Sequence, residues 1–215
     1  MAISSKQRQK KLERKRKKKK GLLAKKNKDI SVSQSKAANY ASLPIYECLV
    51  PDALFEIGIG NVIVSRRTPT GNITFGAFLV DVFCLGVKSA FLTVVREFDY
   101  ENKVKASLMM SDELQTFESI HPECAKKLVE GAMAYAKELG FSHHQDYENA
   151  KNIFGDIVSS NCPVKYKYGK DGKPFYIRGP NETMAEAKEI VNQLHQRCGE
   201  DGFDYLVILG EGSIP

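Results

Sequence analysis

The chain has no apolar segment long enough to cross a membrane as a helix. A bilayer span needs about 20 consecutive apolar residues, and none of the 215 residues lies in such a segment. The short segment 21–24 is followed at once by Lys25 and Lys26, whereas the apolar part of a secretory signal needs about 7–15 residues. The sequence therefore predicts neither a membrane span nor secretion.

Paired cysteine motifs are also missing. Cys48, Cys84, Cys124, Cys162 and Cys198 are odd in number, widely spaced and without a C-x-x-C pair. This pattern is typical of reduced thiols and not of a disulfide framework or a zinc site. We therefore expect a cytoplasmic protein, or a nuclear or nucleolar one if the host is eukaryotic.

Nucleotide-binding motifs are absent as well. Gly58 and Gly60 do not belong to a G-x-G-x-x-G sequence that opens a helix, and no Walker sequence occurs. Residues 169–173, GKDGK, resemble a phosphate loop only in composition. No cofactor is expected.

Acidic residues are almost absent from the first 28 positions. Of the 32 Lys and Arg residues, 14 lie in residues 1–28, together with one of the 26 Asp and Glu residues. This arm therefore has a net charge of +13, and residues 29–215 have a net charge of −7. A polyanion would bind the arm first. The candidate contacts are Lys10, Lys11, Arg14, Lys15, Arg16, Lys17, Lys18, Lys19, Lys20, Lys25 and Lys26.

The composition divides the chain into a basic arm (1–28), a polar linker (29–43) and one globular domain (44–215). The arm has too few apolar residues to offset the entropy of ordering. It is expected to be disordered, or helical on a partner. RNA or the ribosome and nuclear targeting are possible reasons for such an arm. Anionic membrane ranks last, because the arm has no apolar face to insert.

The order of elements predicts an α+β domain with a mainly antiparallel sheet. An N-terminal β-meander over residues 45–95 is followed by helices at 122–139 and 146–154. A β-hairpin around Asp171 and Gly172, a helix begun by a Thr183–Glu186 capping box, and a strand at 203–209 complete the domain. Residues 99–103 are expected to form a polar loop, and residues 111–117 a short helix.

The segment FGAFLVDVFCLGVK, residues 75–88, places Asp81, Cys84 and Lys88 within one apolar run. If Arg67 pairs near Ile73, Asp81 lies near Ile59. Strand alternation sends Asp81 and Cys84 to opposite faces, which argues against a catalytic dyad. A buried Asp81 that fixes strand or loop geometry is favoured over a catalytic or metal-binding acid, since a buried carboxylate needs partners.

A second cluster contains His143, His144 and Asp146. Adjacent histidines rarely face one ion, and no second ligand pair occurs at a zinc-like spacing. No metal is expected, and Asp146 is interpreted as the N-cap of the next helix. If the protein were an enzyme, Asp81, Cys84, His143 and His144 would be its candidate catalytic residues.

Aromatic and basic residues alternate in the expected hairpin, at residues 164–178. Lys167, Lys170, Lys173, Tyr176 and Arg178 could stack on unpaired bases or follow a phosphate backbone. Packing of the aromatic rings, with solvated lysines around them, is the favoured interpretation.

Three functional hypotheses follow. The first is a non-enzymatic RNA- or ribosome-associated protein, in which the arm binds and the acidic domain supplies specificity or recruits a protein partner. The second is a hydrolase or nuclease that uses Asp81 with the region of His143 and His144. The third is a protein-interaction module that its arm directs to a compartment.

Overall fold

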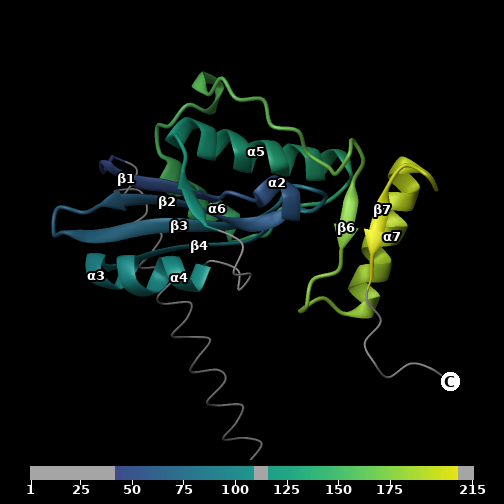
Figure 1. Cartoon of the computed structure of the whole chain (residues 1–215), viewed down its shortest axis with the longest axis horizontal. Coiled ribbons are helices and arrows are strands. Elements are labelled where there is room, and N and C mark those ends of the chain that lie inside the picture. The colour runs from purple at the N-terminus through teal and green to yellow at the C-terminus, as the bar shows by residue number, and fades with distance from the viewer. Residues whose placement is uncertain (1–41, 109–115, 208–215) are drawn as a thin grey trace, which may run out of the picture. The chain divides into compact units, whose positions relative to one another are not determined.

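A five-stranded antiparallel sheet forms the centre of the domain (Figure 1). The computed structural model describes residues 42–108 and 116–207, within one compact unit, Tyr40–Pro215. The strands have the order β4-β3-β2-β1-β5. They are β1 (Ile45–Pro51), β2 (Ile59–Arg67), β3 (Asn72–Asp81), β4 (Gly86–Arg96) and β5 (Phe117–Ser119). The expected α+β fold is confirmed.

The register of the β2–β3 hairpin agrees with the sequence prediction. Arg67 lies opposite Ile73, and Ile59 lies opposite Asp81. The turn at residues 68–71 ends at Gly71, whose positive φ of 79° suits a residue without a Cβ atom. Strand β3 is apolar towards both faces because helical segments cover each side of the sheet.

Three helical segments cover one face of the sheet. They are α5 (Pro122–Glu138), α6 (Tyr147–Ala150) and η2 (Lys151–Phe154), and α2 (Leu54–Ile57) lies beside them. Helix α5 places Leu128, Val129 and Ala132 against strand residues such as Phe78 and Val80, as its 3.6-residue spacing predicts. Gly140, with φ of 89°, follows its C-cap residue Leu139.

The opposite face packs against one winding segment, α3 (Glu97–Asp99), η1 (Tyr100–Val104, π-helical) and α4 (Lys105–Leu108), seen below the sheet in Figure 1. The expectation of a polar loop at residues 99–103 is wrong. The side chain of Tyr100 is fully buried against Phe75, and ion pairs four residues apart add to the helical turns. Residues 109–115 lie outside the described residues, and Phe117 begins β5 instead of ending a helix.

Residues 175–206 form a β-α-β unit. Strands β6 (Phe175–Ile177) and β7 (Asp204–Leu206) pair in parallel and are joined through α7 (Met184–Cys198). Helix α7 begins with the predicted capping box, in which Thr183 and Glu186 bond reciprocally. The hydrophobic core of the β-α-β unit is formed with residues of the β3–β4 turn and of the end of α5. It comprises Cys84, Leu139, Tyr176, Ala187, Leu194 and Phe203. No helix in the described residues combines the length and apolarity of a membrane span.

The expected β-hairpin at residues 164–178 is limited to its turn. Lys170 and Lys173 exchange two backbone hydrogen bonds around Asp171 and Gly172, both of which have positive φ. The backbone N–H of Gly169 donates to Val82, and β6 pairs with β7. The hairpin prediction is wrong beyond the turn, because each side of the turn has a different partner.

Cys124 and Cys162 form a disulfide, with Cα atoms 5.0 Å apart. The expectation of five reduced thiols is therefore wrong for this pair, and Cys48, Cys84 and Cys198 are the free cysteines of the described residues. The bond joins the first turn of α5 to the segment after η3 (Ser159–Asn161). The two cysteines are 38 residues apart in the sequence, so no local pattern predicts their contact.

Loss of this disulfide should destabilise the fold. A closed loop of this length corresponds to about 4 kcal/mol of lost chain entropy in the unfolded state. The free energy of unfolding of Cys124→Ser/Cys162→Ser, measured by urea denaturation, should fall by about this amount. Adding a reductant should reproduce the loss in the wild type and leave the double variant unchanged. Equal stability of the oxidised and reduced wild type would contradict the expectation.

The guanidinium of Arg66 holds irregular segments against β2. Its Nε donates to the carbonyl of Ile153 at 2.7 Å, and another nitrogen donates to that of Phe154 at 2.9 Å. A third donates to the carbonyl of Leu43, at the start of the domain. Burial lowers the pKa of Arg66, while the charge of Asp156 opposes this shift. Backbone carbonyl dipoles therefore satisfy this buried charge.

Arg66→Ala should reduce the free energy of unfolding by about 3 kcal/mol, because buried carbonyls lose their donors. The neighbouring Arg67→Ala is the matched control: Arg67 pairs with Glu97 at a half-exposed position. Thermal and urea unfolding of both variants would test the difference. If Arg67→Ala were as destabilising as Arg66→Ala, the role given to the carbonyl contacts would be wrong.

Candidate functional site

Asp81 closes the turn between β3 and β4. Its Oδ1 accepts hydrogen bonds from the backbone N–H groups of Phe83 and Cys84, both at 2.9 Å. The residue is only 6% exposed. Burial raises the pKa of Asp81 from 3.8 to about 6, although the charge of Lys88 and the backbone donors oppose that shift. Asp81 therefore fixes loop geometry, which is the role that the sequence favoured.

Cys84 is not directed away from Asp81 by strand alternation. Strand β3 ends at Asp81, and the chain turns so that the N–H of Cys84 faces the carboxylate. The thiol itself is fully buried in the core of the β-α-β unit. Burial, followed by the nearby charge of Asp81, raises the pKa of Cys84 far above its usual value. A thiol in this environment is protonated at neutral pH and is a weak nucleophile.

Lys88 connects the turn to the segment before α7. Its Nζ donates to Oε1 of Glu182, and both side chains are less than one-fifth exposed. The other oxygen, Oε2, accepts from Tyr176 Oη at 2.8 Å and from the N–H of Gly179 at 2.9 Å. Burial raises the pKa of Glu182, but these donors outweigh it, so the pKa lies below its usual value. Asp81, Cys84 and Lys88 thus belong to one junction.

His143 and His144 lie near this junction but take part in local contacts. The backbone N–H of His144 donates to the carbonyl of Val87 at 3.0 Å. Its Nδ1 accepts from the N–H of Asp146, and Nε2 of His143 lies 3.1 Å from a carboxylate oxygen of Glu148. Asp146 occupies the expected N-cap position of α6 but forms no side-chain cap bond. The described residues contain no cluster of three or more His, Cys, Asp and Glu residues arranged to hold a metal.

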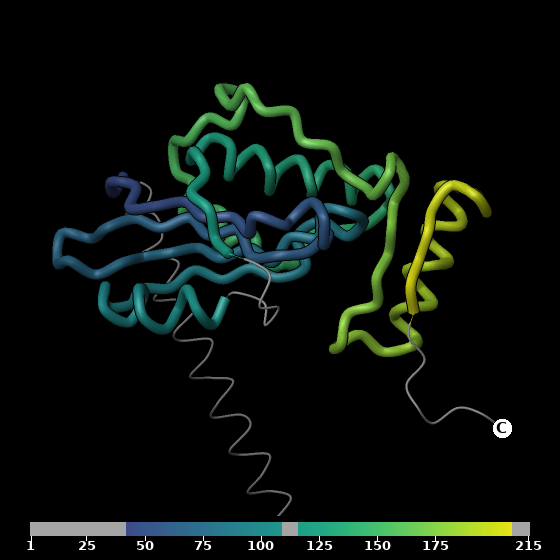
Figure 2. The backbone as a smooth tube through the Cα atoms, in the orientation of Figure 1, coloured from purple at the N-terminus to yellow at the C-terminus, as the bar shows by residue number. Residues whose placement is uncertain are grey.

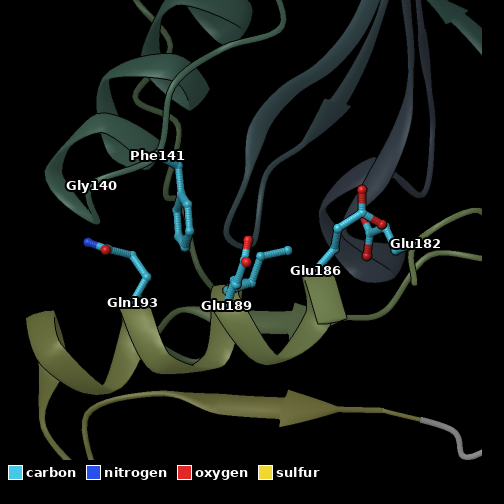
Figure 3. A pocket seen from close by; sticks show the side chains of 7 residues that line it. Gly140, Phe141, Glu182, Glu186, Glu189 and Gln193 are labelled. Carbon is cyan, nitrogen blue, oxygen red and sulfur yellow. The ribbon is translucent and has the colours of Figure 1, made fainter. Parts of the chain in front are cut away.

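An open groove of about 440 Å³ lies between the end of α5 and the side of α7 (Figure 3). Its lining residues are Gly140, Phe141, Glu182, Glu186, Glu189, Ile190 and Gln193. None of the four candidate catalytic residues lines it. This groove was not predicted from the sequence, although Glu186 and Glu189, three residues apart, lie on one face of α7.

Two of the three carboxylates that line the groove make structural contacts within the domain. Glu182 binds Lys88, and Glu186 accepts from the backbone N–H of Thr183 at 2.7 Å in the capping box. The side chain of Glu189 makes no hydrogen bond or ion pair with any other described residue. The groove thus favours cationic groups, yet two of its three acids already have partners.

The residues of the expected hairpin are divided between the interior and the surface. The ring of Tyr176 is fully buried, and Nε of Arg178 donates to the carbonyl of Glu182. Lys167, Lys170 and Lys173 are exposed. The candidate cations of the arm, residues 10–26, lie outside the described residues. Stacking on bases through Tyr176 is therefore incompatible with its burial, whereas the lysines are accessible.

No protein-family model, curated protein or solved structure matches this chain.

Asp81→Asn tests the buried carboxylate. The raised pKa means that the folded state binds more protons than the unfolded state between about pH 4 and pH 6. The stability from this group is present below that range and is lost as pH rises through it. The unfolding free energy of the wild type, minus that of Asp81→Asn, should fall by on the order of 3 kcal/mol from about pH 3 to pH 7.

Urea denaturation across this pH range measures the difference, and Asp171→Asn, in an exposed turn where Asn is well tolerated, is the control. A difference between the wild type and Asp81→Asn that does not change with pH would contradict the assigned protonation.

Proposed function

We propose that the protein binds RNA, free or within the ribosome, through the basic arm of residues 1–28. The α+β domain is the non-catalytic body attached to this arm. The observation that carries the proposal is the separation of charge along the chain: +13 in the arm and −7 in the rest. An acidic body repels nucleic acid from most of its surface, so the arm supplies the affinity.

The contacts of the domain support a non-enzymatic body. Asp81 binds backbone N–H groups, His143 lies against Glu148, and Tyr176 binds Glu182. These groups have partners within the protein, and the acid-lined groove would repel a phosphate. The cationic arm is left as the part of the chain best suited to a polyanion.

Deletion of residues 1–28 should abolish binding to a labelled oligouridylate while the domain stays folded. Each phosphate contact contributes roughly −0.7 to the slope of log K against log salt concentration for a single strand. Fluorescence anisotropy at several salt concentrations should therefore give a steep slope for the full chain and no measurable binding for the truncated one.

A full-length variant with the arm residues in scrambled order is the matched control, and it should bind like the wild type because the interaction is electrostatic. Unchanged thermal unfolding of the truncated chain would show that the domain is intact. Tight, salt-sensitive binding by the truncated chain would refute the proposal that the arm supplies the affinity.

A further inference from the structure

A lysine strap, residues 163–173, runs along the outer side of α5 (Figure 2). Tyr166 Oη donates to the carbonyl of Cys124 at 3.3 Å, and Tyr168 Oη donates to that of Leu128 at 2.9 Å. Two residues of extended chain span about 6.6 Å, and four residues of α-helix span about 6 Å. The two spacings match, so alternate residues of the strap face the helix.

This match directs the intervening lysines to the solvent. Lys165 and Lys167 are exposed and alternate with the two tyrosines. Lys170 is also exposed, with Nζ 4.8 Å from the ring centre of Phe175. Lys173 is exposed too, and its Nζ donates to the carbonyl of Asp201 at 2.8 Å. Four ammonium groups therefore lie along one short, solvent-facing segment.

The charge of the strap is opposite to that of the domain around it. The strap contains four lysines and one acid, Asp171, giving it +3, whereas residues 29–215 as a whole have −7. Its lysines thus form a local cationic surface on an otherwise acidic body. An anionic ligand that reaches the domain meets attraction at this surface and repulsion at most others.

Both ends of the strap are fixed. It follows Cys162, which is bonded to Cys124 and whose carbonyl accepts from Nζ of Lys127 at 2.6 Å. Near the other end, the N–H of Gly169 donates to the carbonyl of Val82 at 2.9 Å. The backbone that presents the lysines is thus ordered before binding, which lowers the entropic cost of contacting a ligand.

We propose that the lysine strap is a second RNA contact, which binds the phosphate backbone of a single strand held by the arm. The inference rests on the proposed function and adds a site on the domain to it. The tyrosine hydroxyls are bonded to α5, and the ring of Tyr166 stacks on Phe55 with centres 5.6 Å apart. The strap therefore contacts phosphates through charge and gives no base specificity.

The test uses the full chain with Lys165→Gln/Lys167→Gln, and with all four strap lysines replaced by Gln. Anisotropy with oligouridylate should show a salt slope shallower by about 0.7 for each lost contact, or up to about 3 for the fourfold variant. The matched control is Lys137→Gln/Lys188→Gln, which removes two exposed lysines from α5 and α7. The control should retain the wild-type slope.

The outcomes separate this inference from the proposed function. If both strap variants keep the wild-type slope while deletion of the arm abolishes binding, the strap inference is overturned and the role of the arm stands. If the arm deletion keeps its affinity, the proposed function fails, and the strap variants made in that truncated chain decide the strap alone. Strap-dependent binding to phosphatidylserine vesicles, but not to oligouridylate, would also overturn the RNA contact.

Lys165 and Lys167 make no hydrogen bond or ion pair within the described residues, so their replacement leaves folding intact.

Discussion

The carboxylate of Asp81 shapes the turn through which the β-α-β unit joins the main sheet. Because Oδ1 binds the N–H groups of Phe83 and Cys84, the turn has a defined backbone conformation. The carbonyls of Val82 and Phe83 then accept the N–H groups of Gly169 and Phe175. Lys88, at the start of the next strand, binds Glu182 before α7. The C-terminal unit thus depends on a turn that one buried acid organises.

A buried cation also binds backbone groups in this domain, as the buried carboxylate of Asp81 does. Arg66 donates to three backbone carbonyls, as Asp81 accepts from two backbone N–H groups. Lys126 and Lys127 likewise donate to the carbonyls of Ile157 and Cys162. In each case a charged group orders irregular chain beside the sheet or α5, and backbone dipoles offset its desolvation. A strongly shifted pKa is often read as a sign of catalysis, but here burial at a structural turn explains it.

Local patterns predicted the regular elements well, because each depends on neighbours in sequence. The β2–β3 register follows from a tight turn, and the Thr183–Glu186 capping box from residues three apart. Patterns failed where distant segments decide the structure. The polar segment at residues 99–103 is helical because the ring of Tyr100 is buried against the sheet. The Cys124–Cys162 contact is not indicated by any local sequence pattern. For the candidate site, the sequence suggested a structural Asp81 but applied alternation beyond the end of the strand, and so separated Asp81 from Cys84.

For the lysine strap, the expected secondary structure was wrong, but the expected exposure of its lysines was correct. Alternation of Lys165, Tyr166, Lys167 and Tyr168 predicts one apolar and one cationic side, but it does not say whether a strand or a helix covers the apolar side. The carbonyls of α5 bind the tyrosines, so the segment is not a hairpin strand. Lys165 and Lys167 point outward in either arrangement, since they alternate with the half-buried rings of the two tyrosines. Charge exposure therefore follows from the alternation alone, whereas base stacking depends on which partner covers the rings, and in this fold α5 and Phe55 cover them.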